Sequence, residues 1–319
     1  MKLVVSHLGA LSRYVSREFY YIIADLMRTY GWKQINTDKL WTGPGTMKRT
    51  LLNELGELPE TILFWQSCDF VEAHKHDVAS LECNKYIFVD DLQWWNDRMR
   101  STNLTSFALF DTILSTYAYL WDKFYPEFCG AKKLVWIPHS ASSDFMLRYN
   151  PQPENSILLS GHISPSHPLR FKMKLLHEQG SYAIVHHPHP GYQRSYNYDE
   201  DKSVGRAYAG IINRYRAAFT DCHSYQYVVA KYFEIPATGA LLLADDTVKR
   251  PLKELGLREN WHYVPVSQKN LEEQIQFVLD ERNHSCLDDV RKKGQQLIWE
   301  RHKTSDRARQ IDEACRACN

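Results

Sequence analysis

The chain has 319 residues, more than one hydrophobic core usually serves, so its length predicts two domains of about 150 residues each. Its 39 lysines and arginines nearly balance its 38 aspartates and glutamates, which disfavours nucleic acid or an anionic membrane as a partner. Its seven cysteines are odd in number and scattered, which is typical of reduced thiols rather than of a disulfide framework.

The first apolar run, residues 2–6, is interrupted early by Ser6 and His7. It therefore predicts a first strand rather than the core of a signal peptide. No later window approaches the roughly 18 apolar residues of a membrane span. These features predict a soluble, cytoplasmic protein without stable membrane insertion.

Short apolar runs alternate with amphipathic stretches of helical length in the first half of the chain. This is the pattern of parallel βαβ units with helices on both faces of the sheet. Strands are predicted at residues 2–6, 61–65, 85–89, 106–110 and 133–137, and helices at residues 16–30 and 111–124.

A polar run with Pro151 and Pro153 predicts a boundary between two domains, residues 1–150 and residues 151–319. The second half repeats the rhythm, with strands predicted at residues 156–160, 182–186, 217–220, 240–244 and 262–266. A helix is predicted at residues 271–279. A tail helix is predicted at residues 287–312, and it is expected to pack back across the cleft between the two domains. The expected fold is α/β, with two Rossmann-like doubly wound parallel sheets facing a cleft at the carboxyl ends of their strands.

The segment KYFEIPATGALLLAD, residues 231–245, is the most informative part of the sequence. It predicts a short helix, residues 227–236, that follows a strand and offers free N–H groups to a phosphate. Ser224 and Tyr225 lie in the polar link before this helix, where a diphosphate can approach. Lys231 supplies a point charge for the diphosphate, and Glu234 can accept hydrogen bonds from a ribose diol.

This segment resembles the E-x-x-x-x-G motif and following hydrophobic strand of GT-B glycosyltransferases. It is most similar to the spore-maturation (CgeB-type) branch, including relatives encoded by large DNA viruses. SGHISPSHPLR, HHPHPGY and WHYVPVSQKNLEEQIQFVLDERN look like further family blocks in the expected order, so the likeness covers most of residues 156–309.

The resemblance implies transfer of a sugar from a nucleotide-diphosphate donor, by default a UDP-sugar, to a hydroxyl of a glycan acceptor. It also implies that residues 1–150 form the acceptor-binding domain and residues 151–319 the nucleotide-sugar-binding domain. Glu234 corresponds to the ribose-binding glutamate, and Gly239 to the glycine of the same donor-binding motif. The resemblance to GT-B enzymes also implies that no metal is required, so no cofactor beyond the nucleotide-sugar co-substrate is expected.

Many enzymes of this family have two glutamates eight residues apart. Glu234 matches the second of them, but the position of the first is occupied by Gln226. Donor geometry and stereochemical class are therefore left open. Lys231 also fits a fucosyltransferase pattern, although Ala230 replaces its acidic residue, so a GDP-fucose donor is an alternative. A catalytically inactive nucleotide-sugar-binding scaffold is another, whereas an epimerase would need a glycine-rich loop where only Gly9 occurs.

Two groups in the first half are candidates for the general base. His7 follows the first strand, and a histidine there suits proton transfer near neutral pH, although it can equally be a loop residue satisfied by backbone. Asp91, next to Asp90, follows the strand at 85–89, and this pair can instead cap a helix.

Two further candidates for donor binding lie early in the second half. Arg170 can clamp a diphosphate bidentately, the alternative being a surface arginine at a helix start. In HHPHPGY, neighbours His186 and His187 point to opposite faces of an extended chain, which argues against a zinc site. His189 is then expected to contact the donor from a loop.

Overall fold

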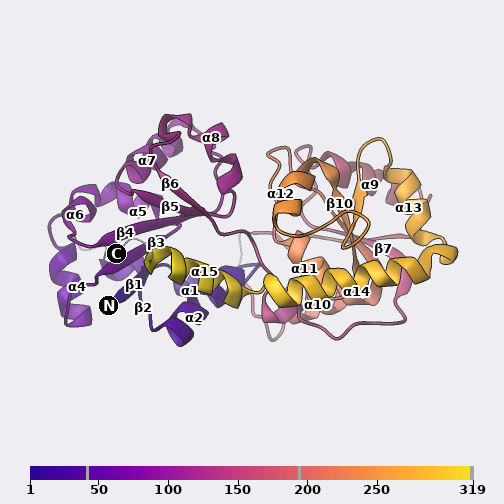
Figure 1. The fold of residues 1–319 in the computed structure, drawn as a ribbon, viewed down its shortest axis with the longest axis horizontal. Helices are drawn as coiled ribbons and strands as arrows, with labels where there is room; N and C mark the ends of the chain where they lie inside the picture. Colours follow the sequence, from indigo (N-terminus) through magenta and orange to yellow (C-terminus); the bar gives the residue numbers. More distant parts are fainter. Residues whose placement is uncertain (41–42, 193–194, 317–319) are drawn as a thin grey trace. The chain divides into compact units, whose positions relative to one another are not determined.

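The computed structural model describes residues 1–40, 43–192 and 195–316, which form two compact units (Figure 1). Unit 1 consists of Met1–Ser12, Phe19–Pro138 and Ser305–Asn319, and unit 2 of Arg13–Glu18 and His139–Thr304. The division therefore falls after Pro138, whereas the sequence predicted it after residue 150. The prolines of the predicted linker instead precede the first strand of unit 2.

The sheet of unit 1 has six strands in the order β2-β1-β3-β4-β5-β6, and every neighbouring pair is parallel. Its strands are β1 (Lys2–Val5), β2 (Lys33–Ile35), β3 (Thr61–Trp65), β4 (Asn84–Val89), β5 (Thr112–Ser115) and β6 (Lys133–Trp136). All five residues of β3 are buried, as expected for a central strand covered on both faces.

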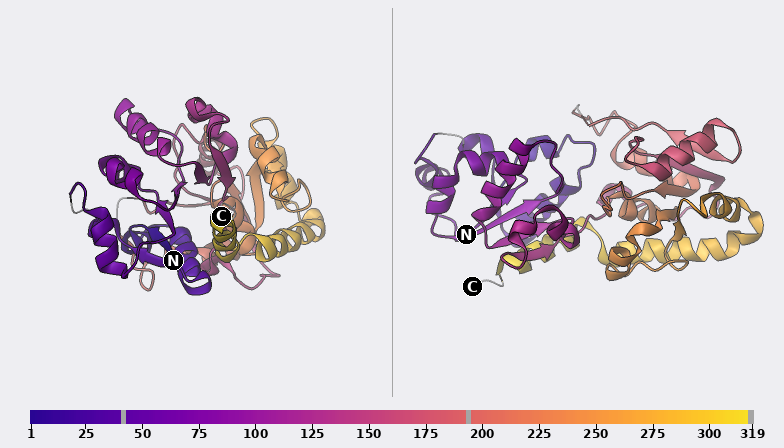
Figure 2. Two further views of the ribbon diagram at one scale, coloured as in Figure 1. Left: turned by 60° about the vertical axis from the view of Figure 1, so that its left-hand side comes forward. Right: turned by 90° about the horizontal axis from the view of Figure 1, so that it is seen from above.

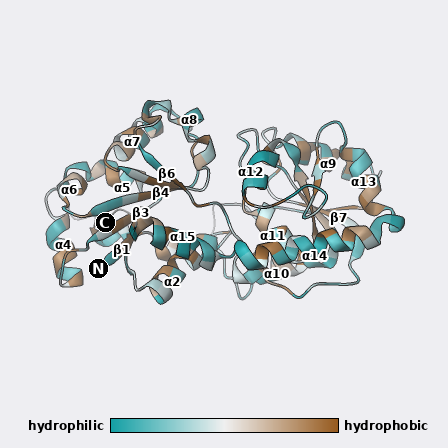
Figure 3. Ribbon diagram, viewed as in Figure 1, coloured by the Kyte–Doolittle hydropathy of each residue, from teal (hydrophilic) through white to brown (hydrophobic). Residues whose placement is uncertain are grey.

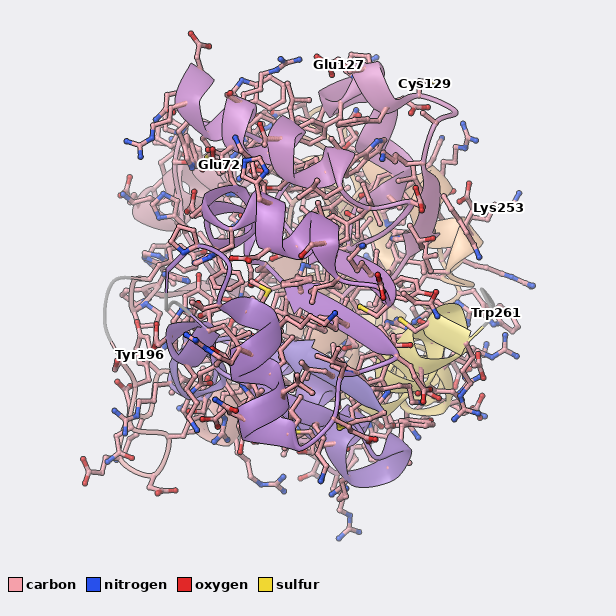
Figure 4. All side chains as sticks on the ribbon, turned by 90° about the vertical axis from the view of Figure 1, so that its left-hand side faces the viewer. Glu72, Glu127, Cys129, Tyr196, Lys253 and Trp261 are labelled. Atoms are coloured by element: carbon pink, nitrogen blue, oxygen red, sulfur yellow. The ribbon has the colours of Figure 1, made fainter. Side chains whose placement is uncertain are left out.

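Helices cover both faces of this sheet (Figure 1). They are α1 (Leu8–Leu11), α2 (Glu18–Tyr30), α3 (Thr37–Leu40), α4 (Met47–Leu55), α5 (Cys68–Ala73), α6 (Lys75–Ser80), α7 (Asp97–Ala108), α8 (Trp121–Phe124) and α15 (Thr304–Arg316), with 3-10 turns η1 (Ala118–Leu120) and η2 (Pro126–Phe128). The described cysteines are all free, and Cys129, labelled near Glu127 in Figure 4, is exposed.

The stretch from residue 106 to residue 124 was predicted wrongly. Residues 106–108, expected to begin a strand, are the last turn of α7, which starts where Asn96 caps the amide of Met99 at 2.8 Å. The expected helix at 111–124 instead contains the strand β5. A short apolar run such as TILS fits the period of a helix as well as that of a strand. Here the two β-branched residues of the run and its place between two strands favour β structure.

The last helix of the chain belongs to the core of unit 1. The predicted tail helix at 287–312 is two helices, α14 (His284–Arg301) and α15, separated at His302. Ala308 and Ile311 of α15 are buried in one cluster with Ile22 and Leu26 of α2. Figures 1 and 2 show α15, in yellow, beside the indigo and purple elements of unit 1.

The sheet of unit 2 has five parallel strands in the order β11-β10-β9-β7-β8. These strands are β7 (Glu154–Ser160), β8 (Ile184–His187), β9 (Tyr215–Thr220), β10 (Leu241–Asp245) and β11 (Val264–Val266). All residues of β9 and β10 are buried. Because the strands are parallel, the loops after them all start at one edge of the sheet, where ligands of such sheets bind.

The helices of unit 2 are α9 (Pro168–Glu178), α10 (Gly205–Arg214), α11 (Lys231–Ala237), α12 (Lys249–Glu254), α13 (Leu271–Leu279) and α14, with 3-10 turns η3 (Ser143–Phe145), η4 (Asp246–Val248) and η5 (Glu281–Asn283). Apolar residues of α9, α13 and the start of α14 share one buried cluster with the strands, while α11 packs against α10 and α14. Figure 3 shows the apolar residues concentrated on the strands. Within the described part of the chain, no helix is long and apolar enough to span a bilayer.

Candidate functional site

Three neighbouring strands of unit 2, in the order β9-β7-β8, end in loops that carry three of the predicted donor-binding residues and lead into the helices that carry three more. The loop after β7 begins with Gly161 and His162, the loop after β8 contains His189, and the loop after β9 begins with Asp221 and Cys222. Lys231 and Glu234 lie on α11, which follows the last of these loops.

Asp221 organises the centre of this edge. Its carboxylate is fully buried, and its Oδ1 lies 2.8 Å from Nδ1 of His167 and 2.9 Å from Nε of Arg170. Its Oδ2 accepts the backbone N–H of Arg170 at 3.1 Å. Burial raises the pKa of Asp221, but the hydrogen bond from His167 and the charge of Arg170 outweigh it, so the pKa is lower than usual.

Arg170 is a buried residue rather than the surface arginine that was the alternative, since only 4% of it is exposed. Its two terminal nitrogens donate to the backbone oxygen of His162 and to the hydroxyl of Thr220, both at 3.0 Å. Its charge is balanced by Asp221 at 2.9 Å. Acceptors within the protein therefore occupy much of the hydrogen-bonding capacity of this guanidinium, which the sequence suggested would clamp a diphosphate.

Gly161 sits between two cationic side chains. Its φ is +101°, a conformation that L side chains rarely adopt, and a Cβ there would lie 3.1 Å from both NH1 of Arg170 and Cε of Lys231. The positive φ favours glycine here, and any larger residue would also displace the ends of these two side chains.

Lys231 contacts hydroxyl groups rather than a carboxylate. Its Nζ donates to the hydroxyl of Tyr208 and lies 3.5 Å from the hydroxyl of Ser160, which is itself 2.6 Å from the Tyr208 hydroxyl. The ammonium also lies 4.6 Å from the centre of the Tyr208 ring. In the described residues no acidic side chain forms an ion pair with it, so its charge is available to an anion.

Glu234 is a buried carboxyl group one turn beyond Lys231 on α11. Burial raises its pKa to about 7, the charge of Lys231 opposes that rise, and the charge of Glu18 adds to it. Among the residues that the structure describes, no group hydrogen-bonds to its carboxylate. Its carboxylate oxygens are not completely buried, so a ligand that brings hydrogen-bond donors can reach them.

Glu18 reaches unit 2 from the short segment of residues 13–18. Its carboxylate accepts hydrogen bonds from the hydroxyl of Ser140 at 2.8 Å and lies 2.7 Å from Nδ1 of His139. Arg17, its neighbour, pairs with Asp144 at 3.1 Å and stacks 3.6 Å above the ring of Tyr198. These contacts hold the segment beside His139 and Asp144, whose charges act on the pKa of Glu234 together with that of Glu18.

The predicted residues Ser224 and Tyr225 surround the side chain of His223. The hydroxyl of Ser224 lies 3.1 Å from Nδ1 of His223, and the backbone N–H of Tyr225 donates to the same nitrogen at 3.2 Å. The two rings of His223 and Tyr225 stack with their centres 4.4 Å apart. These contacts order the loop that joins β9 to α11.

His189 is partly buried at the same edge, and Gly191 donates its backbone N–H to Nδ1 of His189 at 3.0 Å. Burial, and next the charge of Lys231, lower its pKa to about 4. His186 and His187 do lie on opposite faces, because His186 contacts His177 of α9 whereas His187 stacks on Tyr208 of α10. Across the described ranges, no group of three or more potential ligands is placed to hold a metal ion.

Gly239 is the one predicted donor-binding residue that the structure does not bring to this edge. It precedes β10 and so lies at the opposite end of that strand. Its φ is +86°, and Nε of Arg291 donates to its backbone oxygen at 3.0 Å. Its left-handed conformation ends α11 and lets the chain pack on α14, which is a structural role.

The two candidate bases lie in unit 1 after β1 and β4. His7 precedes α1, its side chain is 55% exposed, and its Nδ1 is 3.6 Å from the carboxylate of Asp38. Asp91 is exposed after β4. The helix cap expected of Asp90 and Asp91 is wrong, since Asn96 caps α7 and Asp90 instead accepts the Thr116 hydroxyl at 2.6 Å.

Sequence reasoning assigned no individual role in this site to Asp221, His223, Gly161, Tyr208 and Glu18, although it placed the first two in the polar link that a diphosphate can approach. A signal existed for the first three, because Asp221 and Gly161 directly follow predicted strand ends and His223 lies three residues after one. Tyr208 and Glu18 lie within helices, and nothing in their local sequence indicates the contacts that they make.

Residues 172–313 match the sequence model of a family described as Glycosyl transferase-like. This region includes the loops after β8 and β9 and the whole of α11. No curated protein matches the chain by sequence.

Several solved structures share the fold of almost the whole chain at very low identity. One is an alpha-glucosyltransferase in complex with UDP-glucose and DNA containing an abasic site (TM-score 0.63, 10% identity, 98% of each chain covered). Another is sucrose-phosphate synthase from Thermosynechococcus elongatus (TM-score 0.64, 11% identity, 99% of this chain and 98% of the other). A third is Anabaena HepE in complex with UDP (TM-score 0.58, 8% identity, 99% of this chain and 100% of the other).

The fold is thus the GT-B fold, with two parallel-sheet α/β units of six and five strands that match glycosyltransferase structures. This confirms the predicted fold class.

Proposed function

We propose that the protein transfers a sugar from a nucleoside-diphosphate donor to a hydroxyl group of a glycan, and that unit 2 holds the donor. The observation that carries this proposal is the pair formed by Glu234 and Lys231. Among the residues that the structure describes, the Glu234 carboxylate has no hydrogen-bond partner, and the Lys231 ammonium, one helical turn away, forms no ion pair with an acidic side chain. A ribose diol beside a diphosphate supplies what each of them lacks.

The charge arrangement supports a diphosphate as the part of the donor nearest Lys231. Arg170 is paired with Asp221, whereas Lys231, which lies beside Gly161, forms no ion pair with any of the described acidic residues. A preorganised ammonium and N–H donors stabilise a departing diphosphate. We therefore infer that the reaction requires no metal ion.

A UDP-sugar is the first donor to test, because solved structures with this fold contain UDP or UDP-glucose. GDP-fucose is the second donor to test, because Lys231 occupies the position of the lysine in the fucosyltransferase pattern. On this proposal unit 1 binds the acceptor, and His7 or Asp91 removes the proton from its hydroxyl group if the anomeric centre is inverted.

Glu234→Gln tests the ribose contact. We expect the variant to bind UDP and GDP ten- to a hundredfold more weakly in calorimetric titrations, since a charged or strong acceptor is replaced by an amide. Binding of inorganic pyrophosphate, which has no ribose, should stay unchanged.

Glu273→Gln, an exposed glutamate on α13, is the matched control and should bind all three ligands normally. Equal affinity of Glu234→Gln and the unaltered protein for both nucleotides would refute the ribose assignment. Release of free sugar from UDP-glucose or GDP-fucose then separates an enzyme from an inactive binding scaffold.

A further inference from the structure

Four histidine rings follow one another along the carboxyl edge of the unit 2 sheet. Ring centres are 6.4 Å apart between His189 and His162, 6.4 Å between His162 and His167, and 4.7 Å between His167 and His223. We call these four rings the imidazole row. It spans three neighbouring strands, because His189 follows β8, His162 follows β7 and His223 follows β9.

The two outer rings have the same local hydrogen bond. In each, Nδ1 accepts the backbone N–H of the residue two positions later, from Gly191 to His189 at 3.0 Å and from Tyr225 to His223 at 3.2 Å. A ring nitrogen that accepts a hydrogen bond carries no proton, so the neutral ring holds its proton on Nε2. The loop backbone therefore fixes the tautomer of both rings.

The surroundings of both rings favour this neutral form. Burial is the main cause that lowers the pKa of His189, followed by Lys231 on α11, His162 after β7 and Arg170 on α9. The pKa of His223 is also lowered, first by burial and then by His167, with Arg170 and His162 adding to the effect and Asp221 opposing it. Protonation of Nδ1 would in addition break the backbone hydrogen bond.

The backbone of His223 is held in a conformation that few non-glycine residues adopt, with φ at +59°. Such a conformation persists only where the surrounding contacts impose it, and it is concentrated at functional sites. Here the contacts are the edge-on packing against His167 and the stacking on Tyr225. They place an imidazole ring at the end of β9, close to Asp221 and Arg170.

We propose that His189 and His223 bind the diphosphate of the donor through uncharged Nε2–H groups, while Lys231 supplies the positive charge. This inference rests on the proposed function. Both rings lie in loops at the carboxyl edge of the unit 2 sheet, one on each side of the loop after β7 that begins with Gly161. Neutral donors of fixed tautomer recognise phosphate oxygens without taking up a proton.

His189→Asn and His223→Asn test the proposal separately in the two loops. Asparagine keeps an acceptor, Oδ1, in the place of Nδ1, so the loop hydrogen bond can persist, and it tolerates a left-handed backbone. It removes Nε2–H. We expect each variant to bind UDP, GDP and inorganic pyrophosphate roughly tenfold more weakly in titrations with EDTA present.

His76→Asn, at an exposed histidine of unit 1, should leave all three affinities unchanged. Titrations in two buffers of different ionisation enthalpy, at about pH 6 and about pH 8, count the protons taken up on binding. We expect the same count in the unaltered protein and in both variants.

Four outcomes would contradict the inference. Proton uptake that disappears in the variants would show that the rings bind as imidazolium ions. Unchanged affinity in both variants, or nucleotide binding that needs a divalent cation, would overturn the inference and leave the proposed function standing. Failure of the unaltered protein to bind UDP, GDP and pyrophosphate, both with EDTA and with added Mg²⁺, would overturn the proposed function as well.

Discussion

Glu234 shows how one buried carboxyl group links ligand binding to stability. Burial raises its pKa from 4.5 to about 7, despite the nearby ammonium of Lys231. Between these two pH values the folded protein holds a proton that the unfolded chain has lost. The contribution of Glu234 to stability is therefore fully present below about pH 4.5 and is lost as the pH rises through about 7.

Glu234→Gln should remove this pH dependence. In denaturant titrations we expect the free energy of unfolding of the variant to fall less than that of the unaltered protein between about pH 5 and about pH 8, by roughly 3 kcal/mol. Glu273→Gln should follow the unaltered protein. Parallel pH profiles for all three proteins would show that Glu234 has an ordinary pKa in the folded state.

The pair Lys231 and Glu234 could be predicted from sequence because both residues lie within one short helix that follows a buried strand. The network around Asp221 could not, since His167 and Asp221 are 54 positions apart and meet only when β7 and β9 pair. Periodicity reports which face of an element is buried. It does not report which distant side chain lies opposite.

At the scale of elements, α14 packs closely against the backbone before β11 because of a glycine. A Cβ at Gly294 of α14 would lie 2.7 Å from the backbone oxygen of His262 and 3.5 Å from Pro236 of α11. Gly210 of α10, in contrast, has no atom within 4 Å of its Cβ position. These two helical glycines have similar local preferences and opposite surroundings.

Gly294→Ala and Gly210→Ala should therefore change stability in opposite directions. Alanine favours a helix by about 1 kcal/mol over glycine, so Gly210→Ala should raise the free energy of unfolding by about that amount. In Gly294→Ala the contact with backbone forces a shift, and we expect a net loss of about 1–3 kcal/mol. Thermal and denaturant unfolding measure both, and a stabilised Gly294→Ala would show that α14 moves away without cost.

Most strands were predicted at the right place because buried parallel strands are continuous apolar runs, as in TILFW of β3 and LLLAD of β10. The failure at 106–124 concerns elements whose apolar runs are as short as one strand. There the period is ambiguous, and the capping contact of Asn96 and strand pairing decide the outcome.

At the scale of the whole chain, unit 1 depends on a helix that comes last in the sequence. Asp312 of α15 is buried, and its Oδ1 accepts the indole N–H of Trp32 at 2.7 Å and pairs with the ammonium of Lys2. Its Oδ2 lies 2.7 Å from the guanidinium of Arg316. The first strand of the chain is thereby tied to the last helix.

Asp312→Ala should destabilise the protein by about 3 kcal/mol, because it leaves the Lys2 ammonium and the Trp32 indole without their buried partner. Glu313→Ala, on the exposed face of the same helix, should change stability by less than about 0.5 kcal/mol. Denaturant unfolding followed by tryptophan fluorescence compares the two. Equal effects would mean that the buried ion pair contributes nothing.

The division of the chain into Met1–Ser12, Arg13–Glu18, Phe19–Pro138, His139–Thr304 and Ser305–Asn319 has a consequence for evolution and for engineering. The backbone passes between the two units four times, so cleavage of any one connection leaves them covalently joined. A chimera that exchanges unit 2 with that of a relative must replace two separate stretches, residues 13–18 and 139–304. A single-junction recombinant would instead combine Arg17 and Glu18 of one parent with Asp144 and His139 of the other.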